Sequence, residues 1–228
     1  QFSLGLYRNF KSNTFETSLE VYYKKITNYL DYKSGANLVL NQHIETDVIA
    51  TKGKAYGVEL LIKKLTGNLN GWISYTWSRV LLKQEDPLAG ELINNGNFYH
   101  ANYDKPHDVT LIGNYRINHR FSISLNATYS TGRPITLPIG RFYYAGSVRT
   151  LFAARNQFRI PDYYRADFSM NIDGNHKIYQ KTHNSWTIGV YNITGRKNPY
   201  SVYYVSENGA INGYKLSIFG SAIPYVNF

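Results

Sequence analysis

Two-residue alternation between apolar and polar side chains is the feature that most limits how this chain can fold. The segment FSISLNATYST shows it most clearly, with Phe121, Ile123, Leu125, Ala127 and Tyr129 in one phase and serine, asparagine and threonine in the other. This period places successive side chains on opposite faces of a β-strand. The chain is therefore predicted to be all-β, with strands that carry one apolar and one polar face.

Nine segments follow this alternation, and the connections between them are short and long in turn. The predicted strands are residues 1–10, 15–29, 53–65, 69–82, 106–117, 120–132, 163–174, 184–205 and 211–228. The short connections are KSNT, TGN, Asn118-His119 and the segment after Gly174, and the long ones are 30–52, 83–105, 133–162 and 206–210. Several strands reach the length of about 9–11 residues that a tilted strand needs to cross a membrane.

Short turns at one end and long loops at the other are typical of an antiparallel transmembrane β-barrel, whose short turns are periplasmic and whose long loops are extracellular. In the hairpin of residues 56–78, the apolar face then meets lipid, and Tyr75 and Trp77 lie near the outer interface. The polar face of this hairpin carries Glu59, Lys63, Asn70, Ser74 and Thr76. A soluble β-sandwich that buries the same apolar face is the alternative.

Nine is an odd number of strands, which does not suit a closed bacterial barrel. Bacterial single-chain barrels have even strand counts, and an unpaired sheet edge is costly in lipid. The first residues, QFSLGLYRNF, already alternate and contain no signal peptide. We therefore expect residues 1–228 to be the C-terminal section of a larger barrel, with its earlier strands encoded before Gln1.

Composition excludes several other classes of protein. The mean hydropathy is negative, and no run approaches the roughly 18 apolar residues of a membrane helix. The net charge of +10 comes from lysines and arginines that are scattered along the chain. They form no nucleic-acid-binding motif, so nucleic acid is not expected as a partner, whereas lipopolysaccharide or acidic lipid would attract the same charge. Cysteine is absent, so a disulfide framework and a thiolate metal site are excluded.

Three runs resemble TonB-dependent outer-membrane receptors, most closely their SusC-like, carboxypeptidase-regulatory-domain branch. They are GKAYGVELLIKKLTGNLNGWISYTWSR, then NYDKPHDVTLIGNYRIN with SLNATYSTGRPITLP, and YNITGRKNPYSVYY with the closing IPYVNF. The resemblance implies a 22-stranded barrel, closed by an N-terminal plug, that imports a scarce ligand with energy relayed by TonB. The plug, the TonB box and the earlier strands are absent from residues 1–228.

The ligand-binding candidates lie in the loop that follows Gly132. They are aromatic or cationic, and are Arg133, Arg141, Tyr143, Tyr144, Arg155 and Arg159. Such side chains stack on sugar rings or bind anions, although a solvated loop that rests against lipopolysaccharide has the same composition. Terminal Phe228 resembles the C-terminal aromatic signal that the barrel assembly machinery recognises. The run from Tyr103 to Asp108 resembles a structural signature, in which Pro106 ends the loop and the charges pair inside the barrel wall.

No enzyme motif, cofactor site or metal site is predicted. His107 and Asp108 point to opposite faces of a strand, which does not suit a shared metal ion. The predicted function is nutrient import (a glycan, a peptide or a siderophore) across the outer membrane of a Gram-negative cell, with the TonB complex as partner and a surface lipoprotein as a further candidate. The alternatives are a passive porin or adhesin-like barrel and a soluble carbohydrate-binding β-sandwich.

Overall fold

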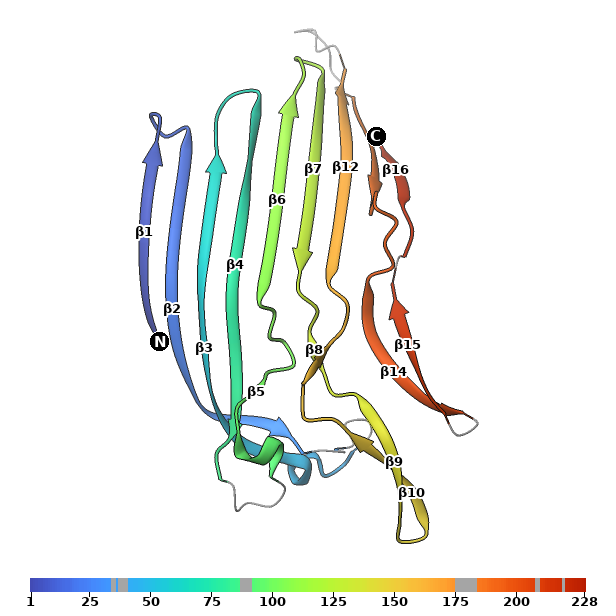
Figure 1. Ribbon diagram of the computed structural model, residues 1–228. Helices are drawn as coiled ribbons and strands as arrows, with labels where there is room; N and C mark the ends of the chain where they lie inside the picture. The colour runs from blue at the N-terminus through green and yellow to red at the C-terminus, as the bar shows by residue number, and fades with distance from the viewer. Residues whose placement is uncertain (34–35, 37–40, 87–91, 175–183, 208–209, 219) are drawn as a thin grey trace.

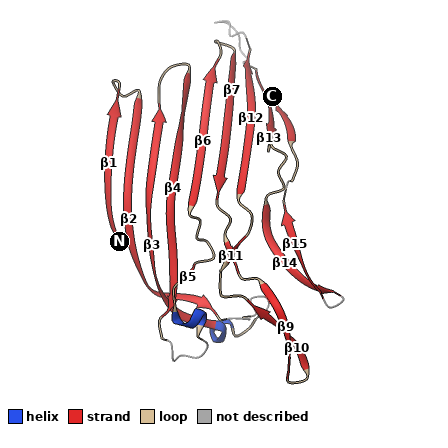
Figure 2. Ribbon diagram, in the orientation of Figure 1, coloured by secondary structure: helices blue, strands red, loops and turns tan. Residues whose placement is uncertain are grey.

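The computed structural model describes residues 1–33, 36, 41–86, 92–174, 184–207, 210–218 and 220–228. Strands dominate this part of the chain, and its two helices are single 3-10 turns (Figure 2). Within it, no helix has the length and the apolar character needed to cross a membrane.

Nine antiparallel strands lie side by side in one curved sheet (Figure 1). In spatial order they are β1 (Phe2–Phe10), β2 (Phe15–Tyr32), β3 (Val48–Lys64), β4 (Leu69–Gln84), β6 (His107–Arg116), β7 (Phe121–Ser130), β12 (Tyr163–Asp173), β13 (Ser185–Tyr191) and β16 (Ile223–Asn227). The two-residue strand β5 (Tyr99–His100) adds to the end of β4. Because each strand except β16 neighbours the preceding long strand, the predicted succession of nine membrane strands is confirmed.

The strand register gathers the apolar phases of all nine strands on one face. Leu60 lies between Leu19 and Tyr75, and Met170 lies between Ile123 and Ile188. Many of these side chains are exposed because no second layer covers them. The opposite face carries serines, asparagines and charged residues at mid-strand, so the predicted two-faced hairpin of residues 56–78 is confirmed. A sandwich would bury the apolar face under a second sheet, and the described residues form none there.

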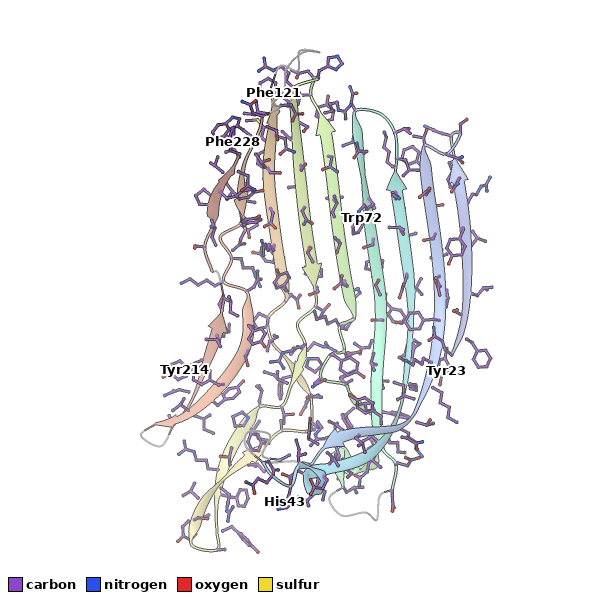
Figure 3. The ribbon with its side chains drawn as sticks, turned by 180° about the vertical axis from the view of Figure 1, so that it is seen from behind. Tyr23, His43, Trp72, Phe121, Tyr214 and Phe228 are labelled. Carbon is purple, nitrogen blue, oxygen red and sulfur yellow. The ribbon has the colours of Figure 1, made fainter. Side chains whose placement is uncertain are left out.

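Two bands of aromatic side chains border the apolar face. The band at the short-turn end consists of Phe10, Phe15, Tyr115, Phe121, Trp186 and Phe228, and the band toward the long connections consists of Tyr23, Tyr56, Tyr75, Trp77, Tyr129 and Tyr164. Figure 3 shows Phe121 and Phe228 at one end of the sheet and Tyr23 toward the other. Aromatic girdles at two levels are expected where a barrel crosses the two interfaces of a membrane.

The connections sort to the two ends of the sheet as predicted. The turns after β1, β3 and β6 lie at one end, and the long connections lie at the other (Figure 1). Of the predicted short segment after Gly174, residues 175–183 lie outside the described part of the chain, and so do residues 208–209 of the predicted connection 206–210. The first long connection is shorter than predicted, because β2 and β3 continue to pair past a bulge near Asn28, which has a φ of 56°.

The long connections contain structure of their own. The first two hold the 3-10 helices η1 (Ile44–Asp47) and η2 (Ile93–Gly96). The longest holds β8 (Pro134–Ile135) paired with β11 (Phe158–Arg159), and a hairpin of β9 (Pro138–Tyr144) and β10 (Ser147–Phe152). A small core at the end of β3 and β4 packs beneath them and consists of Ile49, Leu82, Ile93, Tyr99 and Ala101.

The last two predicted strands, 184–205 and 211–228, are each interrupted, which corrects the sequence-based boundaries. Outside the sheet, and within the described residues, β14 (Pro199–Glu207) and β15 (Ala210–Ser217) pair only with each other. Asn192 causes the first break: its φ is 53°, its backbone N–H donates to Asp167 Oδ1 (2.7 Å), and its side chain donates to the Arg196 carbonyl (3.1 Å). This break ends at Pro199, where β14 begins.

The sheet has two edges. In the described part of the chain, β1 pairs only with β2, and β16 pairs only with β13. Both edges therefore carry backbone groups that need further strands if the sheet stands in lipid.

Candidate functional site

Asp104 is the centre of the polar contacts that hold the long connections on the wall. Its side chain is fully buried. One oxygen accepts a hydrogen bond from the Val80 backbone N–H (2.7 Å), and the other forms an ion pair with Arg159 and lies 3.6 Å from Arg79 Nη1. A buried carboxylate needs such partners, because desolvation penalises an unpaired charge by several kcal/mol. The charge pairing predicted for the Tyr103–Asp108 run is therefore confirmed at Asp104.

Arg159 connects this centre to the longest connection. Its Nη1 also donates to the backbone carbonyls of Asp104 (2.7 Å) and Gly132 (2.9 Å). The chain passes very close at Gly132, where an added Cβ would lie 1.8 Å from the Ile160 carbonyl oxygen. The guanidinium of Arg159 is thus directed into the protein.

Arg155 makes a second tie between connections that are far apart in the sequence. Its guanidinium bonds to Asp31 Oδ2 (3.3 Å) and to the Tyr32 carbonyl at the end of β2. Tyr99 donates its hydroxyl hydrogen to the same Asp31 oxygen (2.6 Å). Asn94 bonds to the backbone of Arg155 in both directions. The second and third long connections therefore meet at one carboxylate near the end of β2.

Burial shifts the pKa values of several groups in this region. It raises the pKa of Tyr99, with the Asp31 hydrogen bond as the next cause, and it raises the pKa of Tyr103 to about 12. Burial is also the main reason that the pKa of His100 is lowered. The His100 Nδ1 lies 3.4 Å from Asp104 Oδ2 but without the geometry of a hydrogen bond. These groups are neutral at pH 7 and leave the charge of the site to the arginines and aspartates.

A pocket of about 780 Å³ lies beside this polar centre, on the inner face of the wall. Its lining mixes charged and aromatic side chains, among them Lys105, Asp108, Arg133, Tyr163, Tyr191 and Tyr200. Asp162 lies between the lining residues Pro161 and Tyr163, and it accepts hydrogen bonds from the Gly132 backbone N–H (2.9 Å) and the Tyr129 hydroxyl (2.7 Å). The Gly132 hydrogen bond is the largest cause that lowers the pKa of Asp162, so its carboxylate stays charged.

The β9–β10 hairpin carries the other predicted ligand-binding residues away from this pocket. Tyr143 and Tyr144 are strongly exposed, at 74% and 66% of their surface. Arg141 donates from Nη2 to the Ala210 carbonyl (2.9 Å), which joins this hairpin to the β14–β15 hairpin. Both hairpins carry exposed aromatic rings, with Tyr200 and Tyr203 on β14, outside the sheet of nine strands.

The predicted ligand residues thus fall into three places rather than one. Arg133 lines the pocket, Arg141 and the two tyrosines lie on the hairpin, and Arg155 and Arg159 hold connections together. Sequence reasoning missed the contribution of Lys105, Asp108, Tyr163, Tyr191 and Tyr200 to the pocket. The alternation within their own strands could have predicted Asp108, Tyr163 and Tyr191. All three occupy inward-facing positions at the long-connection ends of their strands.

Phe228 lies against Trp186 at the short-turn end, with ring centroids 4.5 Å apart. The pair forms the last part of the aromatic band there. No group of three or more acidic, histidine or cysteine side chains in the described residues has a geometry suited to a metal ion.

The antiparallel sheet has an apolar outer face between two aromatic bands and a polar inner face, and its long loops lie at one end. These features define the wall of an outer-membrane β-barrel. A family model described as "TonB dependent receptor-like, beta-barrel" matches residues 1–193. The chain therefore belongs to the TonB-dependent receptor-like β-barrel family. No curated protein sequence matches it.

Two solved structures show the same fold. The ferripyoverdine receptor of the outer membrane of Pseudomonas aeruginosa, bound to ferripyoverdine, has a TM-score of 0.55 and 14% identity over 98% of this chain. The ferric-catecholate import receptor Fiu from Escherichia coli K12, in its closed form, has a TM-score of 0.52 and 14% identity over 98% of this chain. The chain spans 25% and 26% of the length of these two proteins.

Proposed function

We propose that residues 1–228 are the C-terminal wall section of a TonB-dependent receptor that imports a nutrient across the outer membrane of a Gram-negative cell. The observation that carries the proposal is the apolar band that runs between two aromatic girdles across nine strands, in a member of this family. The section acts in transport and carries out no chemistry. A passive porin is disfavoured, because the family is one of energy-coupled receptors.

The proposal includes further strands on both edges of the sheet. The free backbone groups of β1 and β16 support it, since each unpaired group in lipid costs several kcal/mol. We propose a closed barrel of 22 strands, with a plug at the N-terminus of the whole receptor that faces the polar inner surface and contacts TonB. Phe228, in the aromatic band that meets the periplasmic interface, is the proposed signal for the barrel assembly machinery.

The proposed ligand site combines the inner pocket with the exposed hairpin. Arg133 and the tyrosines of the pocket provide a cationic group and flat rings, and Tyr143 and Tyr144 provide further exposed rings on the hairpin. These groups suit a glycan, a peptide or an anionic siderophore. Arg155 and Arg159 are better suited to shaping the site, because their guanidinium groups already bind Asp31 and Asp104. Within the family we propose the SusC-like branch, whose receptors work with a surface lipoprotein.

Uptake by intact cells tests this function. A strain that lacks the full-length receptor gene is compared with the parent on a panel of glycans, peptides and ferric siderophores, each as the limiting nutrient. We expect a growth defect on one class, and the same defect when TonB is deleted in the parent. Replacement of Tyr143 and Tyr144 by alanine should weaken uptake, whereas replacement of Val148 on the same hairpin should not. Uptake that continues without TonB would contradict the proposal and favour a passive porin.

A further inference from the structure

The outward face of β2, β3 and β4 changes character in steps toward the long-connection end. Across these strands the register places Val21, Val58 and Trp77 at one level, and Tyr23 beside Tyr56 at the next. Beyond the tyrosines the next outward residues are Lys25 on β2 and Lys54 on β3, and on β4 Lys83 follows Leu81. Lys54 follows Tyr56 by two residues, which is about 7 Å along the strand. A cationic level therefore lies directly outside the aromatic band.

Four lysines on three adjacent strands form two successive rows of this cationic region. Lys25 of β2 lies directly opposite Lys54 of β3, and Lys52 of β3 lies directly opposite Lys83 of β4. Like charges at directly opposed positions of two strands are normally destabilising. Among the residues that the structure describes, no carboxylate lies within 4.0 Å of any of these four ammonium groups. The four lysines are named the lysine cluster below.

Phe98 orients two of the lysines. Its ring is 45% exposed, with the Lys54 ammonium 4.8 Å and the Lys83 ammonium 5.8 Å from its centroid. The ring attracts each cation weakly, and it holds two like charges close together at the surface. An anion that meets both ammonium groups would remove their mutual repulsion. The cluster thus has the arrangement of an anion-binding site with a fixed distance from the apolar band.

We propose that the lysine cluster binds the phosphate groups of lipids in the outer leaflet. The inference rests on the membrane placement in the proposed function, and it adds a specific lipid site to it. The apolar residues beneath the cluster would contact the acyl chains, the tyrosines would lie at the interface, and the lysines would meet the phosphates at the next level. Lysine is well suited to this task because it binds phosphate as a point charge.

Direct binding of lipid to the purified full-length receptor in detergent tests the proposal. The probe is lipid A with both phosphates, and its affinity is measured by native mass spectrometry or by the lipid-dependent rise in melting temperature. The variant Lys25→Gln/Lys54→Gln removes two opposed charges. Each lysine near an anionic membrane surface contributes about fivefold to binding, so the variant should bind about 30-fold more weakly.

The control variant is Lys24→Gln/Lys63→Gln, which removes the same charge from the inner face of the same two strands. It should keep the affinity of the unchanged receptor. Lipid A without phosphates should bind all variants weakly, and inorganic phosphate alone should not compete at millimolar concentration, because it lacks the acyl chains. Equal affinity of the two lysine variants for lipid A, or equal binding of the phosphate-free lipid, would overturn the proposal.

A second variant keeps the test decisive if the double variant folds poorly. Phe98→Leu keeps all lysine charges and most of the apolar volume, but it removes the ring between Lys54 and Lys83, and it should weaken lipid A binding severalfold. Nutrient uptake is measured for the same variants. Normal uptake together with lost lipid binding supports the lipid site. Normal uptake together with unchanged lipid binding refutes the lipid site. TonB-independent uptake by the unchanged receptor refutes the proposed function instead.

Discussion

A pair of arginine substitutions at adjacent positions of β7 gives the most direct test of which face meets lipid. Leu125 lies in the middle of the strand on the apolar face, between Gly113 of β6 and Phe168 of β12, and 41% of its surface is exposed. Ser124 lies on the other face and borders an inner pocket of about 410 Å³, which has room for a longer side chain. The two positions are adjacent in the sequence, but their side chains lie on opposite faces of the wall.

Leu125→Arg should destabilise the full-length receptor by about 2–4 kcal/mol, the cost of a cation near the bilayer midplane. This cost corresponds to a decrease of about 30- to 700-fold in the folding equilibrium constant. Ser124→Arg should change it far less. Urea unfolding in lipid vesicles, followed by tryptophan fluorescence, measures the free energy, and the heat-dependent shift of the folded band on a gel gives an independent check. Equal destabilisation by both substitutions would refute the assignment of the faces.

Three further predictions concern the ends of the sheet. In intact cells, a membrane-impermeant maleimide should label Val148→Cys but not Thr66→Cys, whereas both variants should react in lysed cells. Labelling of Thr66→Cys from outside intact cells would contradict the assigned orientation. Gly132→Ala should loosen the longest connection, because its Cβ would lie 1.8 Å from a carbonyl oxygen. Gly140→Ala should be neutral, because the nearest atom to its Cβ would be 3.9 Å away. The rate of limited proteolysis within residues 131–162 compares the two variants. Because burial lowers the pKa of His100, its stabilising contribution is present above pH 6.5 and should be lost as the pH falls below it. The protection factors of residues 97–105, which compare measured with intrinsic exchange rates, should therefore fall at acidic pH, and His100→Gln should remove this dependence.

The membrane-crossing part of the fold was predictable because it depends on a local pattern. Alternation fixes which residues share a face, and the need to keep that face continuous fixes the register. Leu125 and Phe168 were predicted to lie on apolar faces from their own strands alone, and the structure pairs them. The breaks in the last two strands were not predictable in the same way. The turn at Asn192 needs an acceptor from Asp167, which comes from a neighbouring strand.

The candidate site was only partly predictable for a related reason. Arginines in a loop show their charge in the sequence but not their partners. Arg155 binds Asp31, 124 residues away, and Arg159 binds Asp104, 55 residues away. Sequence reasoning therefore grouped them with Arg133, which does line the inner pocket. The two-residue strands β8 and β11 were missed because an alternation of two residues gives no signal.

The interruption at residues 192–198 separates two parts of the chain that can change independently. In a continuous ladder, one inserted residue would shift the register of everything beyond it and turn lipid-facing side chains inward. Here β13 and β16 pair with each other in the wall, while β14 and β15 pair only with each other beyond the break. An insertion or deletion in the outer hairpin therefore leaves the lipid-facing residues in place. Such a hairpin can change in sequence and length between related receptors, or be replaced by protein engineering, while the membrane-crossing strands keep their register.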